Sequence, residues 1–433
     1  MMSGSFPQFV NSFRNSAPYI NAHKGKTFVL VCGGEVVADE TFSSIVHDIA
    51  LLSTLGVNLV LVHGSRSQVE AGLQSANAAS SVVHGTRVTD ARALELAVQA
   101  AGLLRARIEA LLSMGIANSP MHNAGIRVCG GNFVTAQPLG VLGGVDYQHT
   151  GKVRRVDHEG IRAQLALGSI VLLPPLGYSP TGEIFNLTKE DVAVSVATAL
   201  RADKLILLEG APLTAADGKL LRDLPLTLAQ TVQAANATPA LAAAIQACQQ
   251  GVERCHILDF HTDGALLHEL FTRDGIGSMI NRDAYESIRI AGIEDVGGIM
   301  ELIEPLERDG TLVRRSRERL ELEIGCFSVV ERDGAIIGCA ALYPDQPNCT
   351  AELACVATDP VYRRSGRANR LLEHIEGRAR AEGIDRLFVL TTRTAHWFVE
   401  RGFRPAELAE LPEKRRELYN YQRNSLVLIK DLS

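Results

Sequence analysis

The sequence predicts an α/β protein of two successive domains: a parallel-rich sheet covered by helices, then a smaller domain with a mixed sheet. Two observations predict this. From residue 28 to about residue 208, short β-branched and aliphatic runs alternate with helical periodicity, which is typical of parallel strands joined by helices. After Ile280 the pattern changes, and two strand-like runs flank a DG turn at 333–334, which indicates an antiparallel hairpin.

The composition describes a globular chain without a membrane segment. Its 433 residues, 46% hydrophobic and 21% charged, suit two or three domains. No apolar run approaches the roughly 20 residues of a membrane-spanning helix, and the first residues lack a secretion signal. We therefore expect a cytoplasmic protein that does not bind membranes. The formal net charge of −6 gives no general attraction to nucleic acid, so a basic region is interpreted as a local binding site.

The eight cysteines are scattered along the chain, with no C-x-x-C spacing. This distribution favours free thiols over disulfides or structural zinc. We expect no metal site.

The first domain is expected to span residues 1–283. A long amphipathic helix is predicted from Asp90 to Met114, because apolar residues recur there at three- and four-residue steps between a capping residue, Thr89 or Asp90, and Gly115. Strands are predicted at the apolar runs 28–32, 57–62, 126–129, 170–174, 205–208 and 256–260.

The second domain is expected to span residues 284–433, with the order β-α-α-β-β-β-α-β-α-β. A helix is predicted from Gly366 to Glu382, followed by a strand at 387–392, a short helix in AHWFVERG and a final strand. No segment rich in Pro, Gly or Ser separates the domains, so the change of pattern alone places the boundary.

The most informative stretch is ELACVATDPVYRRSGRANRLLEHIEGRAR, at 352–380. A strand there leads into a basic turn, and a helix begins directly after it. Such a turn offers unpaired backbone N–H groups and the positive end of a helix dipole to an anion, and pyrophosphate is its natural guest. A solvated basic helix start is the alternative. The turn consists of Arg363, Arg364, Ser365, Gly366, Arg367 and Ala368.

The pattern R-x-x-G-x-A between a strand and a helix resembles the coenzyme A loop of the GNAT acetyltransferase superfamily. The resemblance implies that this turn binds acetyl-CoA, and that backbone N–H groups at Cys355, Val356 and Ala357 polarise the thioester carbonyl. It makes Glu352 the candidate base, with a surface carboxylate as the alternative. Simple alternation places Cys355 on the opposite face of the strand from Glu352, so Cys355 either lines the site or fills the core.

The donor of a proton to the leaving thiolate stays open. The family often has a tyrosine in its penultimate helix for this purpose, but Phe398 holds the matching position, and a phenyl ring has no proton to give. Thr391 and Tyr421 are the hydroxyls nearby in the sequence.

The segments LVRRSRE, CAALYP, ELACVA, FVLTTRTAHWF and LYNYQRNS together resemble the bacterial N-acetylglutamate synthases. The resemblance implies acetylation of the α-amine of L-glutamate, at the first step of arginine biosynthesis. It also implies that Arg315 holds one glutamate carboxylate, while Arg423 and Ser425 fix the other end. A non-catalytic arginine sensor and an acetyltransferase for a different amine are the alternatives.

The first domain resembles the amino-acid kinases, above all acetylglutamate kinase, in the segments FVLVCGGE, LVLVHGSR, GNFVTAQPLG and FNLTKEDVAVSVATALRADKLILL. That family has a lysine where this chain has Val31, and three glycines where it has Gly64, Ser65 and Arg66. Side chains at these positions crowd the approach of phosphates to the backbone. We therefore expect a kinase-inactive regulatory domain.

Residues 268–278 resemble the arginine-binding signature of arginine-inhibited acetylglutamate kinases. The resemblance implies that Glu269 meets a guanidinium, that Gly275 and Gly277 let the loop wrap around it, and that an N-terminal helix with Tyr19 closes the pocket. An ordinary helix end capped by Gly275 is the alternative. We therefore expect feedback inhibition by L-arginine and a homo-oligomer, a hexamer by resemblance.

Overall fold

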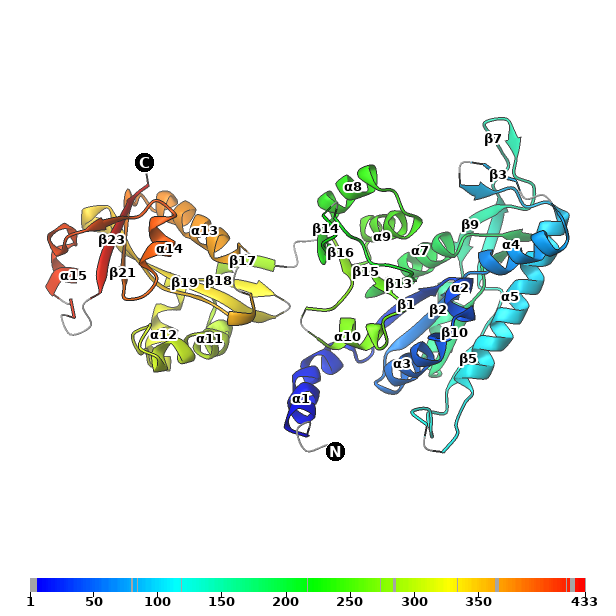
Figure 1. Ribbon diagram of the computed structural model, residues 1–433, viewed down its shortest axis with the longest axis horizontal. Helices are drawn as coiled ribbons and strands as arrows, with labels where there is room; N and C mark the ends of the chain where they lie inside the picture. Colours follow the sequence, from blue (N-terminus) through cyan, green and yellow to red (C-terminus); the bar gives the residue numbers. More distant parts are fainter. Residues whose placement is uncertain are drawn as a thin grey trace. The chain divides into compact units, whose positions relative to one another are not determined.

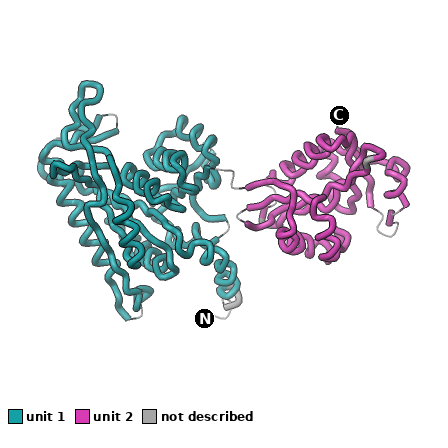
Figure 2. The backbone as a smooth tube through the Cα atoms, turned by 180° about the vertical axis from the view of Figure 1, so that it is seen from behind, with its two compact units in different colours: residues 1–283 teal, residues 284–433 magenta. Residues whose placement is uncertain are grey.

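The computed structural model (Figure 1) describes residues 6–432, except for 79, 80, 84, 118, 216, 273, 283–285, 333, 363–365, 418 and 421–424. The chain divides into two compact units, residues 1–283 and 284–433 (Figure 2). None of the helices in the described part has the length and apolar character needed to cross a membrane.

An eight-stranded sheet forms the centre of the first unit. Its strands are β1 (Thr27–Cys32), β2 (Asn58–His63), β5 (Arg127–Cys129), β10 (Ser169–Leu173), β13 (Lys204–Glu209), β14 (Asp223–Pro225), β15 (Arg254–Asp259) and β16 (Ser278–Asn281). They lie in the order β14-β16-β15-β13-β1-β2-β10-β5, and only β15 and β16 run antiparallel. The predicted parallel-rich sheet is confirmed.

Helices cover both faces of this sheet (Figure 1). Phe28 and Leu30 of β1 face a core shared with α3, α5 and α10, whereas Val29 and Val31 face a core shared with α6, α7 and α9. The long predicted helix is present as α5, and its N-cap is Asp90, whose Oδ1 accepts from the N–H of Ala93 at 2.7 Å. The helices are α1 (Phe6–His23), α2 (Gly34–Ala38), α3 (Phe42–Thr54), α4 (Arg66–Ser75), α5 (Ala91–Leu112), α6 (His158–Ala166), α7 (Lys189–Leu200), α8 (Leu226–Ala235), α9 (Pro239–Gln249) and α10 (Ala265–Phe271).

Smaller sheets complete the first unit. A four-stranded sheet has the order β12-β11-β6-β9, and two hairpins pair β3 with β4 and β7 with β8. The strands are β3 (Val82–Val83), β4 (Thr86–Arg87), β6 (Val134–Pro138), β7 (Val141–Leu142), β8 (Val145–Asp146), β9 (Gly151–Val156), β11 (Leu176–Tyr178) and β12 (Ile184–Asn186).

A seven-stranded mixed sheet forms the second unit, in the order β17-β18-β19-β20-β21-β23-β22. Only β20 and β21 run parallel. The predicted element order is present, but β22 and α15 were not predicted. The elements are β17 (Glu286–Ile290), α11 (Val296–Arg308), α12 (Arg317–Glu323), β18 (Phe327–Arg332), β19 (Ala335–Asp345), β20 (Thr350–Thr358), α13 (Arg367–Ala381), β21 (Arg386–Thr391), α14 (Ala395–Val399), β22 (Arg404–Ala406), α15 (Glu413–Glu417) and β23 (Leu426–Asp431).

The parallel strands β20 and β21 separate soon after they meet. They pair from Thr350 with Arg386 to Glu352 with Phe388. Beyond that register β20 continues beside β19, and β21 continues beside β23. Within these described strands, the edge of β20 from Leu353 onward therefore has no strand partner on the β21 side.

A β-bulge distorts β20 at the start of this free edge. Cys355 and Val356 together stand opposite the single residue Ala340 of β19, and Cys355 has a left-handed φ of 54°. The extra residue interrupts the two-residue alternation of a strand. Cys355 therefore joins the core cluster against which Tyr343, the ladder partner of Glu352, packs. The expectation that Cys355 and Glu352 lie on opposite faces is wrong.

Candidate active site and regulatory loop

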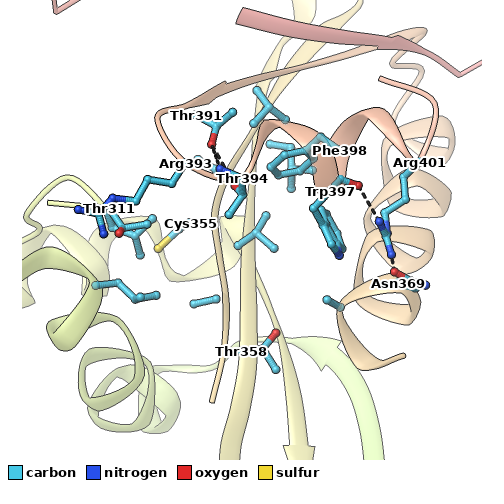
Figure 3. A pocket seen from close by; sticks show the side chains of 18 of the residues that line it. Thr311, Cys355, Thr358, Asn369, Thr391, Arg393, Thr394, Trp397, Phe398 and Arg401 are labelled. Carbon is cyan, nitrogen blue, oxygen red and sulfur yellow. Dashed lines mark hydrogen bonds between the residues drawn. The ribbon is translucent and has the colours of Figure 1, made fainter. Parts of the chain in front are cut away.

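A cavity of about 790 Å³ lies where β20 and β21 separate (Figure 3). Residues from β20, β21, the start of α13, α14 and the loop after α11 form its walls. Of the residues predicted to bind coenzyme A, the cavity is lined by Cys355, Val356, Ala357, Gly366, Arg367 and Ala368. The remaining members of the predicted turn, Arg363, Arg364 and Ser365, lie outside the described residues.

One end of the cavity is suited to an anion. Gly366 has a φ of 79° and stands at the N-terminus of α13, where the first N–H groups of a helix have no partner within the helix. Gly366 and the three residues after it line the cavity, so these groups and the helix dipole favour a negatively charged ligand. A Cβ atom at Gly366 would meet nothing within 4 Å. A left-handed backbone, rather than crowding, therefore favours glycine at this position.

The side chain of Arg367 has a different partner from the one predicted. Its Nε donates to Oε1 of Glu286 at 2.7 Å, and its Nη2 contacts the same oxygen. Arg367 therefore contributes to the cavity wall with a guanidinium that is held in an ion pair with a buried carboxylate.

The bulge supplies the opposite wall of the cavity. Its residues lie on the free edge of β20, where the regular ladder is interrupted. Backbone N–H groups on such an edge are suited to stabilise an oxyanion, because they are fixed before the reaction begins. The Cys355 carbonyl accepts a weak bond from the Cys339 thiol at 3.6 Å.

Glu352 stands at the point where the two strands part, because it forms the last β20–β21 register pair. Its Oε1 accepts a hydrogen bond from Nη2 of Arg415 at 2.9 Å, and its Oε2 forms an ion pair with Nε of the same guanidinium at 2.7 Å. Its neighbour Leu353 lines the cavity, whereas Glu352 does not. To act as a base it must exchange Arg415 for a substrate amine or a water, and this role stays a prediction.

The cavity wall from β21 and α14 carries a hydroxyl pair (Figure 3). Thr391 Oγ1 lies 3.0 Å from Thr394 Oγ1 and accepts from the Thr394 N–H at 3.2 Å. Phe398 is 4% exposed and packs edge-on against Phe403. Tyr421, the other predicted hydroxyl, lies outside the described residues.

Comparison with known proteins agrees with this geometry. Residues 26–259 match the amino acid kinase family, and residues 298–403 match the acetyltransferase (GNAT) family. An amino-acid acetyltransferase of Azotobacter vinelandii is 55% identical over 429 residues, which cover 98% of this chain and 99% of that protein.

This chain belongs to the amino-acid acetyltransferase family. An amino-acid acetyltransferase of Pseudomonas aeruginosa PAO1 is also 55% identical, over 432 residues, 98% of this chain and all of that one. The N-acetylglutamate synthase of Neisseria gonorrhoeae complexed with coenzyme A and L-arginine is 41% identical, with a TM-score of 0.89 over 98% of this chain and 99% of that one. The same enzyme complexed with coenzyme A and N-acetyl-glutamate has a TM-score of 0.63 over the same shares. The predicted fold class and acetyltransferase activity are confirmed.

The three residues predicted to bind the acceptor of this acetyltransferase, Arg315, Arg423 and Ser425, differ in their surroundings. Arg315 lies within electrostatic reach of Cys355, Tyr343 and Glu323. Burial lowers the pKa of Arg315, but these neighbours outweigh it and raise the pKa above its ordinary value. Ser425 is buried, and its carbonyl accepts from the Tyr419 hydroxyl at 2.6 Å. Among the described residues neither Arg315 nor Ser425 is part of the cavity wall, and Arg423 lies outside them.

The sequence reasoning missed Tyr343. Its hydroxyl donates to Glu323 at 2.6 Å, and burial raises its pKa further above the usual range. It pairs with Glu352 in the β19–β20 ladder, so it lies on the same face as the candidate base. Only the register of two strands reveals this position.

The positions of the first unit that correspond to phosphate-binding positions of the amino-acid kinases make other contacts. Val31 is fully buried in the core. Lys189 forms an ion pair with Glu209 at 2.7 Å, and a Cβ atom on Gly64 would lie 3.1 Å from Cδ of Lys189. The lysine stem therefore covers the backbone that a phosphate would approach. The described residues contain no group of three or more His, Cys, Asp or Glu side chains that could hold a metal ion.

The carboxylate of Glu269 holds the predicted arginine-binding loop together. Its Oε2 accepts from the N–H groups of Ile276 and Gly277 at 2.7 and 2.8 Å, and its Oε1 lies 2.7 Å from Nδ1 of His256. A Cβ atom on Gly275 would lie 2.3 Å from Oε2 of Glu269, and one on Gly277 would lie 2.2 Å from Cδ2 of Leu258. Packing therefore requires both glycines, and binding of arginine by this loop stays a prediction.

The N-terminal helix ends beside α10, the helix that carries Glu269. His23, the last residue of α1, has its Nε2 2.8 Å from the carbonyl of Leu270 in α10. Tyr19, one turn earlier, packs partly buried against the same core. The structure thus brings Tyr19 and the helix of Glu269 into one region.

Substitutions at Cys355 should distinguish the role of its left-handed backbone from the role of its thiol. Cys355→Val should lower the free energy of unfolding by about 1–2 kcal/mol, because a β-branched residue resists the left-handed backbone. It should also lower kcat/KM by roughly ten-fold through a displaced oxyanion donor. Cys355→Gly should keep both the bulge and turnover. Urea unfolding and thiol release from acetyl-CoA measure these effects, and an inactive, folded glycine variant would assign the chemistry to the thiol.

The bonds of the Glu269 carboxylate to His256 and to the N–H groups of Ile276 and Gly277, here called the Glu269 clamp, should make stability depend on pH. Burial alone would raise the pKa of Glu269, but His256 and the two loop N–H groups lower it to about 2, from an ordinary value of 4.5. Its contribution is fully present above pH 4.5 and is lost as the pH falls towards 2. The free energy of unfolding in urea should fall by about 3 kcal/mol across this window.

Glu269→Gln should flatten this dependence and cost about 1–3 kcal/mol at pH 7. Asp217→Asn, at an exposed carboxylate that pairs with Lys219, is the matched control and should change the acid profile far less than Glu269→Gln does. Identical acid profiles for Glu269→Gln and the parent chain would contradict the clamp.

Proposed function

We propose that this acetyltransferase makes N-acetyl-L-glutamate from acetyl-CoA and L-glutamate, the first step of arginine biosynthesis. The cavity that opens between β20 and β21 carries the proposal, because it places an anion-binding helix start opposite a free strand edge. The near full-length similarity to an N-acetylglutamate synthase complexed with coenzyme A supports the choice of carrier and acceptor.

In this proposal the pyrophosphate of acetyl-CoA binds at the N-terminus of α13, and the thioester lies beside the bulge. Glu352 takes a proton from the glutamate ammonium group, directly or through a water, because only the neutral amine has a lone pair for attack. The nitrogen forms a bond to the thioester carbon, and the oxyanion is stabilised by backbone N–H groups near Cys355, Val356 and Ala357. The C–S bond then breaks as the attacking nitrogen gives up its second proton, and the thiolate, whose thiol has an intrinsic pKa of about 8.5, leaves and takes up a proton.

The acceptor site of this proposal is cationic. Arg315 lies within electrostatic reach of Cys355 in the bulge, and its neighbours hold its pKa above the ordinary value, so it suits a carboxylate of a dicarboxylic amino acid. Arg423 and Ser425 are assigned the other end of glutamate by the resemblance to N-acetylglutamate synthases. A cationic acceptor such as lysine would meet like charge at Arg315.

The first unit is proposed to be a kinase-inactive regulatory domain that binds L-arginine. The loop from Gly275 to Gly277, held by Glu269, and the adjacent α1 with Tyr19 support this assignment. The N-acetylglutamate synthase similar to this chain is itself complexed with L-arginine. We place the enzyme in the cytoplasm as a homo-oligomer, a hexamer by resemblance.

Acceptor preference tests the proposed function. Thiol release from acetyl-CoA should be at least ten-fold faster with L-glutamate than with L-aspartate, L-glutamine or L-lysine, because each of these changes the reach or the charge of the second carboxylate. Equal rates with L-lysine would overturn the assignment of the acceptor.

Glu352→Gln serves as the matched variant in the same assay. It should lower kcat by roughly 10²–10⁴-fold while leaving the KM for L-glutamate nearly unchanged. An unaltered kcat would remove Glu352 as the base.

Regulation by arginine is a separate prediction. L-arginine should weaken substrate binding or turnover of the full chain by about 5–150-fold, whereas L-lysine, which lacks the planar fork, should not. Glu269→Gln should reduce the effect of L-arginine. Initial rates at increasing effector concentration provide the measurement, and no response to L-arginine would end the proposal of a regulatory site.

A further inference from the structure

A buried carboxylate with three arginine partners lies beside the candidate active site. Glu286 begins β17 and has a side chain that is only 7% exposed. It accepts from Nε of Arg367 at 2.7 Å, from Nη1 of Arg332 at 3.1 Å and from Nη1 of Arg370 at 3.4 Å. One side chain therefore joins β17, the end of β18 and the first turn of α13.

The charge balance of this cluster depends on Glu286. The side chains of Arg332 and Arg367 are 10% and 15% exposed, and both guanidinium groups lie over the ring of Tyr362, at 5.6 and 4.9 Å from its centroid. Burial raises the pKa of Glu286, but Arg367 and then Arg332 outweigh this and lower it. The carboxylate is therefore ionised at neutral pH, and removing its charge leaves two buried cations less well compensated.

The cluster is directly connected to the anion-binding end of the cavity. Arg367 is the first residue of α13, and Arg367 and Tyr362 both line the cavity. A guanidinium held by a buried carboxylate has few rotamers open to it, so the backbone from which it projects is also restricted. Glu286 itself is absent from the described cavity lining.

We propose that Glu286 is a positioning residue for acetyl-CoA, which acts through Arg367 to fix the first turn of α13 where the carrier phosphates bind. The identity of the carrier rests on the proposed function. The restraint on the helix turn is argued from the contacts of Glu286 with Arg367 and Arg370, and does not depend on the identity of the carrier.

Binding of coenzyme A itself, without an acceptor, tests this role. By titration calorimetry on the full chain, Glu286→Gln should raise the Kd for coenzyme A by roughly ten-fold. In the acetyl transfer assay it should raise the KM for acetyl-CoA similarly and leave the KM for L-glutamate nearly unchanged. An unchanged Kd in the folded variant would overturn the proposal, whereas a parent chain that does not bind coenzyme A would instead overturn the proposed function.

Glu376→Gln is the matched control. Glu376 lies on α13, the helix that Arg367 begins, is as buried as Glu286, and forms an ion pair with Lys430 at 2.5 Å. This variant should lose thermal stability as Glu286→Gln does, yet keep the parent Kd for coenzyme A. If this variant raises the Kd for coenzyme A as much as Glu286→Gln does, general loss of helix packing explains the effect and the positioning role of Glu286 is contradicted.

A double-mutant cycle with Arg367→Met tests whether Glu286 acts through Arg367. The double variant should bind coenzyme A no more weakly than Arg367→Met alone, because both changes remove one connection. Fully additive losses would overturn an action through Arg367. If Glu286→Gln does not fold, Arg367→Met still decides the matter, since it leaves Glu286 paired with Arg332 and Arg370, and a parent-like Kd would contradict the proposal.

Discussion

The separation of two parallel strands is the constraint on which the second unit depends. β20 and β21 share three register pairs and then follow different neighbours. The free edge that results carries the bulge at Cys355 and opens the cavity of about 790 Å³. If the pair continued, the ladder would occupy both the volume and the backbone groups that an acyl carrier needs. The cavity proposed to hold the acyl carrier therefore exists because β20 and β21 stop pairing after Glu352 and Phe388.

Paired charges are the second organising feature. Arg367 and Glu352 were expected to face substrate, but each has a partner of opposite charge, Glu286 and Arg415 respectively. In the described part of the cavity, backbone N–H groups of α13 and the side chain of Arg401 therefore line the anion-binding end, while Glu286 holds the guanidinium of Arg367. In the first unit, Glu269 likewise holds its loop through backbone N–H groups.

Periodicity in the sequence was sufficient for the order of the main strands and helices, because each long element repeats its pattern several times. It failed where one residue breaks the repeat: the bulge at Cys355 reverses the alternation, and cysteine gives no sign of a left-handed backbone. The strand β22 and the helix α15, with three and five residues, are too short to show a period. The bond between Glu286 and Arg367 spans 81 positions, so only the folded chain reveals it.

The parallel pairing of β20 and β21 also has a consequence for how this site is inherited. Parallel neighbours need a crossover, and here the crossover is α13, so strand, turn, helix and strand follow one another within residues 350–391. The bulge, the start of α13 and the part of the cavity wall from β21 thus lie in one continuous segment of about a tenth of the polypeptide. Recombination that exchanges the first unit leaves this segment intact, whereas exchange of β17 removes Glu286 and its contact with the first turn of α13.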